Sequence, residues 1–239
     1  RAVAFSQDAT KVVFNWTRAG VGDFCVWDLA RNREVSRLTS DASLAPLFSP
    51  DGRLLAHRVR SPQEIVISDV QTGQEWRRID ADKVNATSSA GSFVFSPNSR
   101  QLATIYTPKQ QIENPGPRRL VVWDLETEKL VASANLNQNG VLLSYSPDGT
   151  SLVVASPSLG TKERTLTFLD AGTGQEQRSI SIPGTLTPLK IDVVGQVIIA
   201  AARSFGCPLV AFSRGDVVLL DLATGHERLR LRGHDGFDC

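Results

Sequence analysis

Short apolar segments alternate with polar turns along the whole chain of 239 residues. The segments at 53–56, 64–67 and 196–200 are rich in Val, Ile and Leu. Residues of this kind pack well on a pleated sheet, and no stretch of the chain has the sustained periodicity of an amphipathic helix. The pattern predicts an all-β chain of short antiparallel strands joined by tight turns.

An aromatic-Ser-Pro-Asp-Gly turn is the first of three markers that recur. Full copies lie at 48–52 and 145–149, and looser copies lie at 5–8, 95–98 and 191–195. Proline presets φ to about −65° at the second turn position, and Asp and Gly tolerate the tight positions that follow. The turn recurs about every 45 residues, a period typical of repeat folds. Each copy is predicted to join two antiparallel strands.

An apolar run closed by aspartate is the second marker, and a polar turn that follows it is the third. Clear Thr-Gly versions of the third marker lie at 72–75, 173–176 and 224–227. Recurrence at equivalent positions favours hydrogen bonds at strand ends or in turns over paired catalytic carboxylates. The aspartates are Asp28, Asp69, Asp124, Asp170 and Asp221.

Each repeat therefore predicts four strands, which in the second repeat are expected near 44–49, 53–59, 64–70 and 75–80. The fourth strand carries charges and is expected to be solvated, whereas the others are more continuously apolar. Four strands at this period predict a β-propeller of four-stranded antiparallel blades, with about five blades present. A single propeller domain is expected over 1–239, with blades at 1–40, 41–86, 87–138, 139–184 and 185–234 and the start of a further blade at 235–239.

The markers resemble those of the WD-repeat family in its bacterial style. The resemblance rests on Trp27-Asp28, Trp123-Asp124, the two full Ser-Pro-Asp-Gly turns and Gly233-His234, and it spans essentially the whole chain. It implies a larger propeller of about seven blades, so we expect further blades on one or both sides. Most blades lack the Gly-His and Trp-Asp pairs that build the family's buried hydrogen-bond network. The TolB-like propellers, which share the turn, are therefore a neighbouring possibility.

Composition narrows the function classes only slightly. The formal net charge is +1 and charged residues make up 21% of the chain, so neither nucleic acid nor a membrane is expected as a partner. Cys25, Cys207 and Cys239 form neither a disulfide framework nor a zinc-ligand spacing. The chain has no methionine, which indicates a piece of a longer protein. No signal peptide or membrane helix is visible, and a cytoplasmic location is expected.

No motif for chemistry stands out. His57, His226 and His234 lack the spacing of a metal site, and His234 matches the structural histidine of the family that the chain resembles. Nucleotide-binding loops, nucleophile elbows and calcium loops are missing from the sequence. We therefore expect no catalytic residue, cofactor or metal, and no enzyme activity.

The loops between the second and third strands vary most, and variable loops on a rigid scaffold often carry function. They are expected at 15–22, 58–63, 108–117, 157–163 and 204–214. Aromatic and arginine side chains are common at binding hot spots, and the basic bias here indicates an acidic protein or peptide partner. The alternative is that these residues are solvated loop positions. The candidate partner-binding residues are Trp16, Arg18, Arg58, Arg60, Tyr106, Lys109, Arg203 and Phe205.

Two functions from different classes remain. The first is a non-catalytic scaffold that mediates protein–protein interaction through its loop face, as part of a larger signalling protein. The second is a propeller enzyme, or a periplasmic TolB-like or small-molecule-sensing propeller. That alternative requires charged residues from several blades to converge, with perturbed pKa values.

Overall fold

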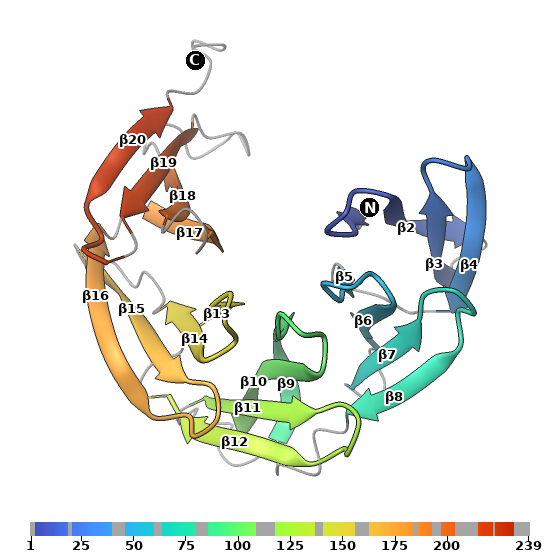
Figure 1. The fold of residues 1–239 in the computed structure, drawn as a ribbon, viewed down its shortest axis with the longest axis horizontal. Coiled ribbons are helices and arrows are strands. Elements are labelled where there is room, and N and C mark those ends of the chain that lie inside the picture. Colours follow the sequence, from blue (N-terminus) through green and yellow to red (C-terminus); the bar gives the residue numbers. More distant parts are fainter. Residues whose placement is uncertain are drawn as a thin grey trace. The chain divides into compact units, whose positions relative to one another are not determined.

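The residues that the structure describes form five four-stranded antiparallel sheets (Figure 1). In each sheet the strands lie side by side in sequence order, which confirms the predicted fold class. The chain divides into two compact units, Arg1–Asn137 and Gln138–Cys239. The computed structural model describes residues 3–18, 21–39, 46–59, 64–79, 86–108, 118–136, 141–155, 163–183, 186–192, 197–203, 215–221 and 223–231.

The first unit holds three blades. The first blade consists of β1 (Val3–Phe5), β2 (Lys11–Arg18), β3 (Val21–Asp28) and β4 (Arg33–Thr39). The second consists of β5 (Leu47–Phe48), β6 (Leu54–Arg58), β7 (Ile65–Asp69) and β8 (Glu75–Ile79). The third consists of β9 (Ala86–Phe95), β10 (Gln101–Pro108), β11 (Arg119–Asp124) and β12 (Leu130–Asn135).

The second unit holds two blades. The fourth blade consists of β13 (Val141–Tyr145), β14 (Ser151–Ala155), β15 (Glu163–Asp170) and β16 (Glu176–Pro183). The fifth consists of β17 (Leu186–Asp192), β18 (Val197–Arg203), β19 (Gly215–Asp221) and β20 (Glu227–Leu231). The further blade expected at 235–239 lies outside the described residues.

Burial follows the predicted gradient across the blades. All but the last residue of β7 are buried, whereas β8 is mostly exposed and β20 is exposed throughout. Charged residues on the fourth strand therefore meet water, and the apolar second and third strands form the core.

The apolar faces of neighbouring blades form the cores within each unit. Phe24 and Val26 of the first blade share a buried cluster with Phe48 and Leu55 of the second. A second cluster joins the second and third blades, and a third joins the fourth and fifth. Burial of these faces removes apolar surface from water, the main favourable term in folding.

The hairpin of β2 and β3 is longer than predicted. The loop predicted at 15–22 is largely strand, because β2 and β3 stay paired as far as Arg18 and Val21. Aromatic and threonine residues there favour extended backbone. Strand β9 begins as early as Ala86, and two register shifts let it keep pairing along β10. Such β-bulges absorb extra residues without ending the ladder.

Exposed apolar residues lie on the first and fifth blades. Phe5 is 61% exposed, whereas its repeat equivalent Phe48 is 6% exposed against the first blade. In the fifth blade Val217 and its cross-strand partner Leu231 are both exposed. That further blades cover such faces stays a prediction. Among the described residues no helix is long and apolar enough to span a membrane.

Candidate functional site

The Ser-Pro-Asp-Gly turns are closed by a fixed set of hydrogen bonds. Ser49 Oγ donates to Asp51 Oδ1 over 2.6 Å and accepts the N–H of Leu54 over 2.9 Å. The N–H of Arg53 donates to the same oxygen of Asp51 over 3.1 Å. The turns that begin at Ser6, Ser96 and Ser146 repeat this arrangement.

The aspartates that end the third strands hold the second kind of turn. Asp69 Oδ1 accepts hydrogen bonds from the N–H and the hydroxyl of Thr72, at 2.8 and 3.0 Å. Equivalent bonds to threonine form at Asp124, Asp170 and Asp221, and Asp28 accepts the N–H of Arg31. The prediction that these aspartates serve turns is confirmed. Hydrogen bonds to the charged form lower the pKa of such carboxyls, as at Asp124 and Asp170.

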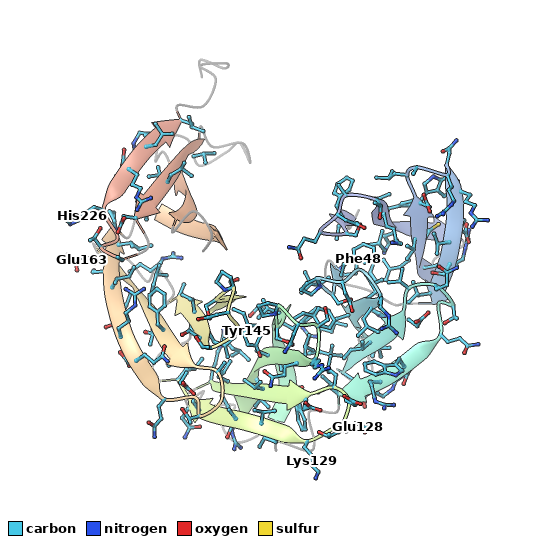
Figure 2. All side chains as sticks on the ribbon, viewed as in Figure 1. Phe48, Glu128, Lys129, Tyr145, Glu163 and His226 are labelled. Atoms are coloured by element: carbon cyan, nitrogen blue, oxygen red, sulfur yellow. The ribbon has the colours of Figure 1, made fainter. Side chains whose placement is uncertain are left out.

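The aspartate turns of the second, third and fifth blades lie against the fourth strand of the preceding blade in the same unit. Gly73 has a φ of +72°, and a Cβ there would lie 2.7 Å from the carbonyl oxygen of Arg37 in β4. Arg77 Nε of β8 donates to the carbonyl oxygen of Leu125 over 3.2 Å and pairs with Glu128 over 3.2 Å. Figure 2 shows Glu128 at the hairpin between β11 and β12, beside β8. The second and third blades are thus locked together by hydrogen bonds as well as by their core.

A groove of about 300 Å³ opens where the second and third blades meet at their turns. Both blades contribute a Ser-Pro-Asp-Gly-type turn and a third-strand aspartate turn to its walls. The lining residues are Asp51, Arg53, Leu54, Asp69, Trp76, Asn98, Ser99, Arg100, Leu125 and Glu126.

Trp76 is the large apolar side chain exposed in this groove. It is 37% exposed although it is a tryptophan, a residue that usually buries its ring. The guanidinium of Arg77 lies 4.7 Å from the ring centroid, and Arg77 is itself fixed to the third blade. The indole is therefore presented to solvent by a rigid support.

The two turns at the base of the groove are joined directly. The N–H of Asp51 donates to Ser99 Oγ over 3.2 Å, and Ser99 adopts a left-handed φ of 60°. A non-glycine residue in this region is uncommon and costs free energy. The contact between the turns helps to hold the two walls of the groove in place.

The predicted partner-binding residues are only partly in loops. Trp16 and Arg18 lie in β2, Arg58 ends β6, and Arg203 ends β18. Arg58 is half-buried. Arg60, Lys109 and Phe205 lie outside the described residues.

Tyr106 is removed from the predicted binding set. It lies inside β10, its side chain is 1% exposed, and it belongs to the core shared by the second and third blades. The strand continues two residues past it, to Pro108. Because the ring is buried between the two blades, it offers no surface to a partner.

His57 and Cys25 are both buried side chains of the first unit. His57 is buried, with Nε2 3.4 Å from Ser68 Oγ and its ring edge-on to Phe24. Cys25 is buried, and burial raises the pKa of its thiol to about 11. Among the described residues no three His, Cys, Asp or Glu side chains are grouped closely enough to hold a metal ion.

The groove at Trp76 was missed by sequence reasoning, which placed function on the loops at the opposite ends of the strands. A signal was present in the repeats. The groove arginines follow the Ser-Pro-Asp-Gly-type turns at a position where other repeats carry threonine.

The fold places the chain in the class of β-propeller proteins, and solved structures of that class resemble it throughout. TolB from Acinetobacter baumannii matches with a TM-score of 0.66 and 17% identity, over 98% of this chain and 55% of that chain. Hydrazine synthase from Kuenenia stuttgartiensis matches with a TM-score of 0.63 and 14% identity, over 92% of this chain and 62% of that chain.

A WD40 protein has the same fold. The C-terminal WD40 domain of Sif2 matches with a TM-score of 0.58 and 12% identity, over 98% of this chain and 58% of that chain. The chain thus spans little more than half the length of these structures, and identities this low show the fold alone. No family profile matches the sequence, and no curated protein matches it.

Proposed function

We propose that this chain is a non-catalytic, WD-repeat-type scaffold that binds a protein partner. The observation that carries the proposal is Trp76, an exposed indole in a groove between two blades that are locked together. Tryptophan and arginine dominate binding energy at protein interfaces, and a rigid site loses little conformational entropy on binding. The groove offers both residue types on a preformed surface.

The surface predicted from the sequence, at the loops between the second and third strands, stays a second candidate. Trp16, Arg18 and Arg203 lie at strand ends on the side of the loops that join second and third strands. The groove at Trp76 lies at the other ends of the strands, where the chain turns between first and second or third and fourth strands. The two surfaces can therefore be tested with separate variants.

A random peptide library displayed on phage tests the scaffold function without assuming a partner. We expect selected peptides to bind the wild type and to bind Trp76→Ala at least about tenfold more weakly, the loss typical of a hot-spot residue. Leu130→Ala is the matched control, because Leu130 is 44% exposed but does not line the groove. Selection of no peptide, or equal affinity for wild type and Trp76→Ala, contradicts the proposal.

The alternative of a propeller enzyme or a sensing propeller stays a prediction. Structures that share the fold include both a hydrazine synthase and a WD40 domain, so the fold favours neither. A converging set of charged residues with perturbed pKa values would favour the alternative. The lowered carboxyl pKa values in the described residues come mainly from turn hydrogen bonds and local ion pairs.

A further inference from the structure

The fourth residue after each third-strand aspartate adopts a left-handed backbone conformation in all five blades. Glycine holds this position in three blades, with φ between 72° and 76°, at Gly73, Gly174 and Gly225. Asn32 holds it in the first blade and Glu128 in the third, with φ of 49° and 57°. Because a side chain costs free energy in this region, these two residues need a compensating contact.

The two blades without this glycine are the two whose third strand ends in Trp-Asp. In the first blade Trp27 Nε1 donates a long hydrogen bond of 3.4 Å to Asn32 Oδ1. In the three blades with glycine, the residue before the aspartate is Ser68, Leu169 or Leu220. A turn side chain that can accept a hydrogen bond therefore occurs only where the strand carries an indole N–H.

Glu128 contacts a different partner in the third blade. Its Oε1 lies 3.2 Å from Arg77 Nε in β8, beside the hairpin labelled in Figure 2. Trp123 Nε1 is buried and has no hydrogen-bond partner among the described residues, although Trp123, Arg77 and Glu128 line one cavity of about 20 Å³. Glutamate is longer than asparagine, which makes the indole contact from the same turn position. The third blade thus leaves a buried donor unsatisfied, which costs free energy.

The contact with Glu128 helps to fix Arg77 against the ring of Trp76. Arg77 Nε donates to the carbonyl oxygen of Leu125, and its Nη1 donates to the carbonyl oxygen of Trp76, each over 3.2 Å. Together with the Glu128 carboxylate, these contacts hold the guanidinium 4.7 Å from the ring centroid of Trp76. A cation held at a ring face attracts the ring, so Arg77 restricts the orientation of the exposed indole.

We propose that Glu128 is a positioning residue of the partner-binding surface at Trp76, an inference that rests on the scaffold function above. Its carboxylate holds Arg77 against the indole at the expense of a hydrogen bond to Trp123. Glu128 and Arg77 are not among the residues that line the groove, so both act on a partner through Trp76. Local contacts given up in this way are expected at functional sites.

Two substitutions copied from other blades separate the two contacts of Glu128. Glu128→Asn copies Asn32 and supplies an acceptor for Trp123, whereas Glu128→Gly copies the glycine of three blades and supplies none. Both remove the carboxylate from Arg77, and both new residues tolerate left-handed backbone. We expect both variants to bind the phage-selected peptides about threefold to tenfold more weakly, because a less ordered indole loses more entropy on binding. Lys129→Ala, at the exposed neighbouring position, is the control expected to keep wild-type affinity.

The indole N–H signals give a second readout that needs no partner. Each tryptophan contributes one such signal to a proton–nitrogen correlation spectrum, and Trp123→Phe identifies that of Trp123. We expect Glu128→Asn to move the Trp123 proton downfield, as a new hydrogen bond does, and Glu128→Gly to cause no such shift. A role of Glu128 in folding alone would not separate the two variants in this way.

A double-mutant cycle tests whether Glu128 acts through Arg77. Arg77→Ser copies Ser36, which binds the carbonyl oxygen of Val70 at the equivalent contact between blades. We expect Arg77→Ser to weaken peptide binding and the double variant with Glu128→Asn to bind no more weakly than Arg77→Ser alone. Circular dichroism and urea unfolding check that each variant folds.

Three outcomes overturn the inference. These are wild-type affinity in Glu128→Asn, losses of affinity that add in the double variant, and an unchanged Trp123 signal in Glu128→Asn. If peptides depend on Trp76 but bind Glu128→Asn like the wild type, the scaffold function stands and the positioning role is wrong. If no peptide depends on Trp76, both proposals are wrong, even where the Trp123 signal moves as expected.

Discussion

Ser36 Oγ in β4 donates a 2.5 Å hydrogen bond to the carbonyl oxygen of Val70, which belongs to the next blade. Both residues are buried, so this polar contact is sealed between two apolar faces. Neighbouring blades of the first unit are therefore joined by specific hydrogen bonds in addition to apolar packing.

Ser36→Ala is expected to lower the free energy of unfolding by about 1–3 kcal/mol, because it leaves a buried carbonyl without its donor. Ser179→Ala is the control, since Ser179 is exposed on β16. Urea unfolding monitored by tryptophan fluorescence gives both values. Equal midpoints for the two variants would contradict the structural role of the bond.

Gly73→Ala and Gly52→Ala separate backbone strain from blade packing. Both glycines have φ near +70°, at +72° and +69°, so alanine is strained at either site by about 1–2 kcal/mol. Only at Gly73 would the new Cβ lie 2.7 Å from a backbone oxygen of the preceding blade, which adds a further ~1–3 kcal/mol. Thermal unfolding is expected to show the larger loss for Gly73→Ala, and the reverse order would refute the close contact.

Acid is expected to destabilise the turns. Hydrogen bonds from Ser6 and Thr10 lower the pKa of Asp8 from 3.8 to about 2. A lowered pKa in the folded state contributes stability above the unfolded value, and that stability is lost as the pH falls from about 4 to about 2. Urea midpoints measured across this range are expected to fall.

Asp8→Asn tests the origin of that loss. Asn98 makes the same bonds in the third blade, to Ser96 and Arg100, so the variant is expected to fold at neutral pH. Its midpoint is expected to fall less steeply with acid than that of the wild type. An unchanged slope would assign the acid sensitivity to other groups.

Cys25 is expected to resist alkylation in the folded protein. Its side chain is 2% exposed, and burial with a hydrogen bond to Glu34 raises its pKa to about 11. Little thiolate is then present at mildly alkaline pH, and the thiolate is the reactive form. Iodoacetamide labelling followed by peptide mass spectrometry is expected to modify Cys25 only after urea is added. Rapid labelling of the native chain would show that the thiol is accessible.

The blades could be predicted from sequence because their turns have strong local signals. The Ser49 hydroxyl bonds Asp51 and Leu54, all within a few residues, so the local motif is enough to indicate the hairpin. Strand length was less predictable. Trp16 continues the hairpin of β2 and β3 because it has a cross-strand partner in Asp23, a contact that no local pattern encodes.

The candidate site was not predicted, because its residues stand out only when the repeats are compared with one another. Arg53 and Arg100 are ordinary surface arginines until Thr10 and Thr150 are seen to close the same turn. The exposure of Trp76 depends on how two blades meet. Tyr106 was misplaced for the converse reason, since the ring lies within the contact between blades.

The contacts between neighbouring blades are asymmetric. In each unit the fourth strand of one blade supports an aspartate turn of the blade that follows it, as at Gly73 and Gly225. When units contact only their neighbours, damage spreads by nearest-neighbour coupling. A defect in a fourth strand should therefore weaken the contact with the following blade directly, whereas the contact with the preceding blade is affected only through the shared cores.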